Sequence, residues 1–136
     1  MGNINSYLTF NGNCLEAMNF YKESLGGELT FQTVGETNSG NQMPEQMKDF
    51  ILHSTLKSDD IILMASDMAG KNGVQKGNNI SLMLNCNSAE HIRDCFEKLS
   101  AGGKQNLPLD KTYWGAIFGS VTDKFGNQWL LNYQAN

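Results

Sequence analysis

The sequence predicts an α+β fold made of two βαβββ modules within a single domain spanning residues 1–136. The first observation is an internal repeat, in which Phe10–Glu16 and Leu84–Glu90 share two asparagines and a glutamate at matching positions. The second observation is that strand-like and helix-like runs occur in the same order in both halves. Module one therefore covers about residues 1–68, and module two covers about residues 78–136.

Each module contains one predicted helix with an apolar face. An Asn-x-x-Glu pair begins each helix, because Asn13 or Asn87 accepts a first-turn N–H and the glutamate favours the positive end of the dipole. Gly26–Gly27 and Gly102–Gly103 end the helices, since glycine tolerates the left-handed conformation of a C-terminal cap. The residues at helical spacing are Cys14, Ala17, Met18, Tyr21 and Leu25 in the first helix, and Ile92, Cys95, Phe96 and Leu99 in the second.

The remaining apolar and β-branched runs predict four strands in each module. In module one they are Ile4–Asn11, Glu28–Val34, Asp49–Leu56 and Ile61–Ser66. In module two they are Asn79–Cys86, Gln105–Leu109, Ala116–Thr122 and Gln128–Tyr133. The closing hairpins correspond when Ile62–Met64 is aligned with Trp129–Leu131, and the polar segments 35–48 and 67–78 are predicted to be surface loops.

Alternation along each strand separates a face that packs on the helix from a face that does not. We predict that the packed face carries apolar residues, among them Ile4, Leu8, Phe10, Phe50, Leu52, Leu56, Ile62, Ile80, Leu82, Leu84, Trp129 and Leu131. The opposite face then carries Asn5, Tyr7, Ile51, His53, Asn79, Met83, Leu63 and Leu130. We expect this second face to line a ligand cavity.

Composition excludes several classes of partner. A net charge of -4 and a pI near 5.0 leave no basic surface for nucleic acid. No apolar stretch reaches the roughly 20 residues that cross a bilayer, so we expect no membrane association. Three cysteines without CxxC spacing and an N-terminus without an apolar leader indicate a reduced, cytoplasmic protein. Cys14 lies in a helical first turn, but without a nearby histidine a buried structural thiol is favoured.

Several motifs, together with the repeated βαβββ order, indicate a family. They are Tyr7-Leu8-x-Phe10-Asn11-Gly12-Asn13, Phe20-Tyr21, Leu25-Gly26-Gly27, His53, Leu63-Met64-Ala65-Ser66-Asp67, Trp114-Gly115 and Asp123-x-Phe125-Gly126-Asn127-x-Trp129. The whole chain thereby resembles the vicinal-oxygen-chelate superfamily of glyoxalases, bleomycin-resistance proteins and extradiol dioxygenases, and more narrowly its PhnB-like branch. Lys124 departs from the proline usual in that branch, which affects the rigidity of this turn.

The resemblance implies a mixed sheet curled around one pocket, with a divalent metal held at four strand positions in catalytic members. Those positions fall on Asn5, Leu63, Asn79 and Leu130 in this sequence. Alkyl side chains offer no lone pair, and two neutral amides alone do not hold a catalytic ion. We therefore predict no metal and no cofactor. The alternative is a rebuilt metal site that uses His53 with Asn5, Asn79 or a neighbouring residue.

The leading hypothesis is thus a metal-free module that binds a small organic ligand, similar to the antibiotic-sequestering members of the superfamily. The candidate ligand-binding residues are His53, Asn5, Tyr7, Asn79, Met83, Leu63, Leu130 and Trp114. The alternative is a metal-dependent lyase, isomerase or dioxygenase that uses His53, or a metal-free enzyme with His53 as general base. A third possibility is a structural dimer whose pocket is filled by Met83, Leu63 and Leu130.

Three further expectations follow. Trp114 either forms an aromatic wall of the pocket or covers a sheet edge. His91 is expected to be a solvated residue near the start of the second helix. Relatives in this superfamily commonly pair, so we expect a homodimer, which light scattering would detect as a mass of two chains.

Overall fold

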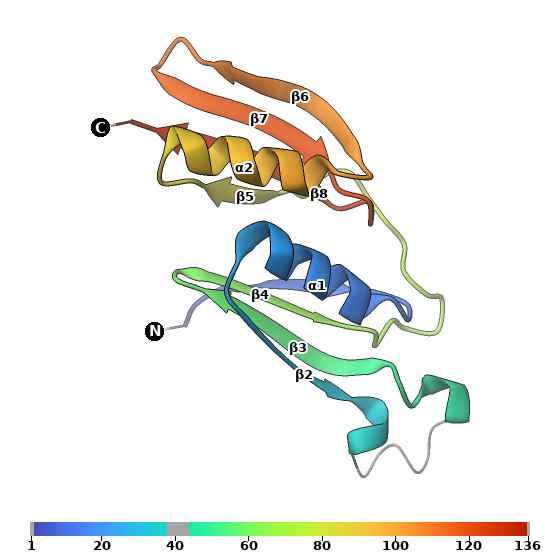
Figure 1. Cartoon of the computed structure of the whole chain (residues 1–136). Helices are drawn as coiled ribbons and strands as arrows, with labels where there is room; N and C mark the ends of the chain where they lie inside the picture. Colours follow the sequence, from blue (N-terminus) through green and yellow to red (C-terminus); the bar gives the residue numbers. More distant parts are fainter. Residues whose placement is uncertain (1, 38–43, 136) are drawn as a thin grey trace. The chain divides into compact units, whose positions relative to one another are not determined.

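The computed structural model describes residues 2–37 and 44–135, which form two compact units, Met1–Gln75 and Lys76–Asn136. Each unit consists of one four-stranded mixed sheet with one helix packed on one of its faces (Figure 1). The predicted α+β fold class and the repeated βαβββ order are confirmed. The boundary between the units lies within segment 67–78, which the sequence predicts to be a connection.

The first unit contains β1 (Ser6–Thr9), α1 (Cys14–Leu25), β2 (Glu28–Thr33), β3 (Ile51–Ser58) and β4 (Ile61–Ser66). The strand order is β1-β4-β3-β2, with β1 parallel to β4 and the other pairs antiparallel. In the described part of the segment between β2 and β3 lie two short 3-10 helices, Val34–Glu36 and Glu45–Met47. Part of the predicted loop 35–48 lies outside the described residues.

The second unit repeats this plan with β5 (Leu82–Asn85), α2 (Ala89–Ser100), β6 (Lys104–Lys111), β7 (Ala116–Thr122) and β8 (Gln128–Gln134). Its order, β5-β8-β7-β6, again has one parallel pair, β5 with β8. Both first strands are shorter than predicted. Ile4 and Ile80 precede them and are 98% and 76% exposed, so their predicted packing on a helix is wrong.

The apolar helix faces pack as the sequence predicts. Cys14, Ala17, Met18 and Tyr21 of α1 are buried, and Ser24 rather than Leu25 completes the buried stripe at the end of that helix. In α2 the buried residues are Ile92, Cys95, Phe96 and Leu99. Among the described residues, none of the helices is long and apolar enough to span a membrane.

The predicted asparagine caps are wrong in both units. Asn13 precedes α1 but makes no side-chain cap; instead Asp67 Oδ1 accepts N–H groups from Gly12 at 2.7 Å and Cys14 at 3.0 Å. The N-cap of α2 is Ser88 rather than Asn87, and its hydroxyl accepts the His91 N–H at 2.9 Å. Asp67 follows the last strand of its sheet, so no local capping pattern identifies it.

Candidate functional site on the helix-free sheet faces

In the first unit, strand pairing defines the sheet face that the helix leaves open, which we call the helix-free face. Tyr7 lies opposite Met64, Met64 opposite Thr55, and His53 opposite Gln32, so these side chains share one face. His53 is exposed, and its Nε2–H donates to Gln32 Oε1 at 3.1 Å, since an amide oxygen can only accept. The predicted placement of Tyr7 and His53 away from the helix is confirmed.

A β-bulge explains why Ile51 does not join this face. Gln32 pairs with His53, but the next residue, Thr33, pairs with Ile51, so Leu52 is the extra residue on β3. An extra residue reverses the alternation beyond it. Ile51 is consequently 1% exposed, and its predicted position beside His53 is wrong.

Leu63 is also on the other face. It pairs with Leu56 and Ser6, and the neighbouring pair joins Ala65 to Ser54, whose hydroxyl lies 3.6 Å from the Cys14 thiol of α1. Leu63 therefore faces the helix and is 3% exposed. The predicted alignment of the two hairpins is out of step by one residue, and a slip of one residue turns every side chain to the opposite face.

The helix-free face of the second unit carries Met83, Leu130 and Ser120, which pair directly across three strands. The predicted placement of Met83 and Leu130 on this face is confirmed. Amide side chains surround them: Asn132 Nδ2 donates to Asn85 Oδ1 at 3.2 Å, and Ser81 Oγ lies 3.5 Å from Gln128 Oε1. The face therefore offers apolar area together with hydrogen-bonding groups.

The other three candidate residues lie outside the paired strands. Asn5 precedes β1, and Asn79 precedes β5; both are exposed. Trp114 lies in the turn between β6 and β7 and is 53% exposed. Its ring stands edge-on to the Tyr113 ring, with 4.8 Å between the two ring centroids.

The donor set on the two helix-free faces does not fit the metal that the resemblance implies. Leu130 offers an alkyl group, and the residues adjacent to Leu63 on β4, Ile62 and Met64, offer no nitrogen or oxygen donor. Asn5 and Asn79 supply only neutral amides. His53 is the single imidazole on these faces among the described residues, and its Nε2 is engaged with Gln32.

The structure brings together a different group of residues whose side chains are of types that can ligate a metal, which the sequence analysis missed. The ligand atoms of Cys86, His91 and Cys95 all lie within 4.8 Å of one another in the second unit. A hydrogen bond between the thiols raises the pKa of Cys86 and lowers that of Cys95. His91 is half-buried rather than solvated, which corrects the expectation for it. The i, i+4 spacing of His91 and Cys95 was the available signal.

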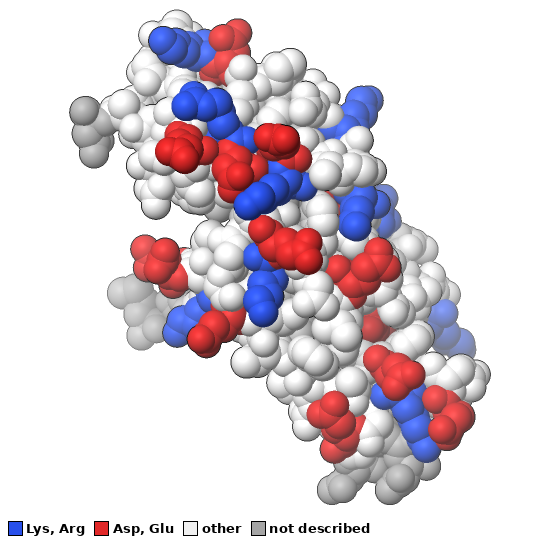
Figure 2. All heavy atoms as spheres, viewed as in Figure 1, with Lys and Arg blue, Asp and Glu red and all other residues white. Residues whose placement is uncertain are grey.

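Lys and Arg side chains are interspersed with Asp and Glu over the face seen in Figure 2, in agreement with the acidic net charge.

Known proteins similar to this chain share its fold across nearly its full length. Residues 3–131 match the Glyoxalase/Bleomycin resistance protein/Dioxygenase superfamily. Protein YjdN of Escherichia coli (strain K12) is 32% identical over 95% of this chain and 93% of that protein. The crystal structure of protein PA1353 from Pseudomonas aeruginosa matches with a TM-score of 0.87 and 35% identity, covering 100% of both chains. A Bacillus cereus structure, described as a putative 3-demethylubiquinone-9 3-methyltransferase, PhnB protein, matches with a TM-score of 0.76 at 24% identity, covering 97% and 99% of the chains.

Proposed function

Because the chain belongs to the glyoxalase/bleomycin resistance protein/dioxygenase superfamily, we propose that it binds small organic molecules on its helix-free sheet faces, each within one unit, without a metal there. The observation that carries the proposal is the composition of these faces. They combine partly exposed apolar side chains with amides and one imidazole, and the four strand positions at which the resemblance places metal ligands, Asn5, Leu63, Asn79 and Leu130, carry neither a carboxylate nor an imidazole.

Tyr7 on the helix-free face of the first unit and Met83 on that of the second are the apolar contacts we assign to bound ligand. Each is 52% exposed although it lies in the middle of a strand, so each can bury further area against a bound molecule. Met83 is unbranched and polarizable and adapts to ligands of irregular shape. The phenol of Tyr7 adds one hydrogen-bonding group to a large ring.

His53 is the polar contact we assign to a ligand on the helix-free face of the first unit. With Nε2–H directed at Gln32, the imidazole is oriented by its neighbour, and Nδ1 is its remaining acceptor. This arrangement suits hydrogen bonding to a ligand. It also defines the competing enzymatic hypothesis, in which His53 acts as a general base or metal ligand through Nδ1.

We further propose that the chain belongs to the PhnB-like branch. Support comes from Asn11-Gly12-Asn13, from the segment ending in Asp67 and from Trp114-Gly115. The roles of Asp67 and Asp123 as buried hydrogen-bond acceptors give two of the branch motifs a structural reason.

Native mass spectrometry of the protein as isolated from cells tests the binding proposal. We expect a non-covalent organic species on the wild type. The variant Tyr7→Ala should reduce its occupancy, since losing an aromatic contact of about 1 kcal/mol weakens binding about fivefold. Tyr113→Ala is the matched control, because Tyr113 is 98% exposed in the β6–β7 turn.

Two results would overturn the proposal. One is a wild-type protein that carries no organic species. The other is equal occupancy in the Tyr7→Ala and Tyr113→Ala variants, which would place any bound molecule away from the helix-free face.

A further inference from the structure

The group formed by Cys86, His91 and Cys95 arises where β5 meets α2, and we call it the Cys-His-Cys cluster. Cys86 directly follows β5, while His91 and Cys95 lie one turn apart on the same side of α2. Both thiols are buried, with 8% exposure at Cys86 and 1% at Cys95. It is the one group of three such ligands found among residues 2–37 and 44–135.

The spacing of the ligand atoms suits a thiophilic metal ion. Around a tetrahedral Zn²⁺ ion, with bonds of about 2.3 Å to sulfur and 2.0–2.1 Å to nitrogen, neighbouring ligand atoms are about 3.5–3.8 Å apart. The atoms of the cluster lie within 4.8 Å of one another without an ion. A shift of about 1 Å therefore brings them to bonding distance. Two sulfurs and one imidazole are a donor set that favours Zn²⁺ over Mg²⁺ or Ca²⁺.

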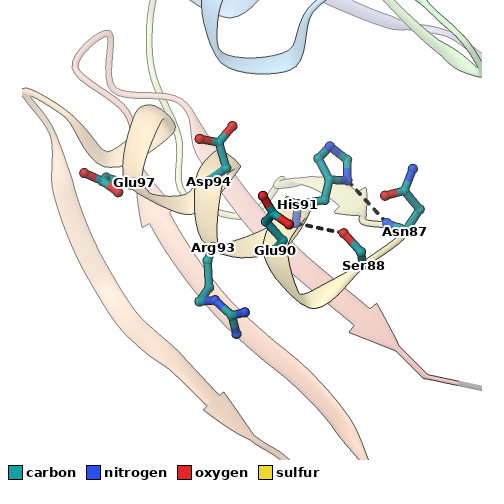
Figure 3. A pocket seen from close by; sticks show the side chains of 7 residues that line it. All are labelled: Asn87, Ser88, Glu90, His91, Arg93, Asp94 and Glu97. Carbon is teal, nitrogen blue, oxygen red and sulfur yellow. Dashed lines mark hydrogen bonds between the residues drawn. The ribbon is translucent and has the colours of Figure 1, made fainter.

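His91 is held in a form that can bind metal. The Ser88 hydroxyl fixes its backbone as the helix begins, and the Asn87 N–H donates to Nδ1 at 3.3 Å, as the dashed lines in Figure 3 show. An accepting Nδ1 marks the neutral imidazole, which is the form that ligates metals. A bond of 3.3 Å is long for N–H···N, so an ion can replace it at little cost.

A surface pocket adjoins the cluster at His91, while Cys86 and Cys95 are not among its lining residues. It has a volume of about 470 Å³, and His91 is both one of its lining residues and a member of the cluster (Figure 3). Glu90, Asp94 and Glu97 line the same pocket with Arg93, so the charge of its walls favours a cation. Asp94 already pairs with Lys98 at 3.0 Å, which leaves the cysteines and His91 as the inner ligands.

We propose that Cys86, His91 and Cys95 bind one Zn²⁺ ion, with a water molecule or another small ligand in the fourth coordination position. The site lies on the helix side of the second unit and uses no residue of the helix-free faces, so it is independent of the small-molecule site proposed above. Its ligands come from a strand end and a helix, which hold them in place before the ion binds.

Titration of the reduced, metal-stripped full chain with Co²⁺ tests the proposal, since cobalt in a thiolate site gives charge-transfer absorption. We expect one Co²⁺ per chain, displaced by Zn²⁺. His91→Gln should weaken binding by about tenfold or more, because losing a ligand exceeds the usual effect of losing an outer-shell partner. Cys86→Ser should lower the charge-transfer intensity, since one thiolate is removed.

Two controls separate this site from others. Cys14→Ser removes the buried cysteine of the first unit, and His53→Ala removes the imidazole of the helix-free face; both should leave Co²⁺ binding unchanged. The proposal is overturned if no charge-transfer band appears, if His91→Gln and Cys86→Ser bind like the wild type, or if Cys86 and Cys95 form a disulfide in protein isolated under reducing conditions. His91→Gln changes a half-buried helix residue, so its result does not depend on repacking the core.

Discussion

At the scale of single residues, two buried carboxylates organise the molecule. Asp67 is 3% exposed and accepts N–H groups from Gly12, Cys14 and Ile51, which joins the start of α1 to the bulged end of β3. Asp123 is 2% exposed and accepts from Phe125, Asn127 and the Trp129 indole, which closes the β7–β8 turn. In each case several N–H donors take the place of water around the carboxylate, and these hydrogen bonds compensate the free-energy cost of burying its charge.

Cys14 shows how the same packing keeps a cysteine unreactive. Cys14 is the first residue of α1 and is fully buried, and this burial raises the pKa of its thiol from the ordinary 9.0 to about 11. The Ser54 hydroxyl already donates to Ala65 O at 2.8 Å, so the thiol is the donor in its 3.6 Å contact with Ser54. The helix dipole is therefore outweighed by burial, in agreement with the structural role the sequence favours.

A pH dependence of stability follows from the raised pKa of Cys14. The folded protein holds the neutral thiol, so this contribution is complete below pH 9 and is lost as pH rises from about 9 through 11. A shift of this size corresponds to roughly 2–3 kcal/mol of unfolding free energy. Urea unfolding should therefore show that, between pH 8 and pH 11, the wild type loses roughly 2–3 kcal/mol more unfolding free energy than Cys14→Ala does. Parallel pH profiles for the two proteins would contradict the assignment.

At the scale of elements, the second glycine of each pair sets how closely a helix end approaches its hairpin. A Cβ on Gly27 would stand 2.4 Å from the Lys57 carbonyl oxygen, and a Cβ on Gly103 would stand 2.1 Å from the Thr122 carbonyl oxygen. These contacts are with backbone atoms, which cannot rotate away. The glycine pairs thus end the helices, through Gly26 and Gly102 at positive φ, and then allow close packing.

Gly103→Ala is accordingly expected to lower the free energy of unfolding by about 2 kcal/mol or more, since the end of α2 must move away from β7. Gly70→Ala is the matched control, because no atom lies within 4 Å of a Cβ there, and it should change stability by less than about 0.5 kcal/mol. Chemical denaturation measures both. Equal midpoints for the two variants would show that the close approach at Gly103 is relieved without cost.

The elements themselves were predictable from the sequence, because periodicity and glycine positions are local signals. Face assignments held for Tyr7, His53 and Met83 and failed at Ile51 and Leu63. One failure comes from a bulge and the other from a one-residue slip, and both depend on pairing between distant segments. The Cys-His-Cys cluster was missed for a related reason, since Cys86 lies outside the helix that carries its partners.

At the scale of the whole molecule, the two units repeat one topology but differ in chemistry on their open faces. The first presents His53 with Gln32, while the second presents Met83 and Leu130 among asparagines and Gln128. In the parts of the two units that the structure describes, neither face brings an imidazole and a carboxylate together at the strand positions of a catalytic metal site. The Cys-His-Cys cluster belongs to the second unit alone, because the first unit has only Cys14 among the three cysteines. The two units are thus similar scaffolds with open faces proposed to bind ligand, and the second unit also carries the proposed zinc site.

The measurement that tests this account most directly is the metal content of protein purified without chelator, compared among the wild type, His53→Ala and His91→Gln. The account predicts that any bound metal is zinc, at no more than one ion per chain, retained in His53→Ala and lost in His91→Gln. A stoichiometric metal that disappears with His53→Ala and persists in His91→Gln would contradict it, because that result would place a metal on the helix-free face.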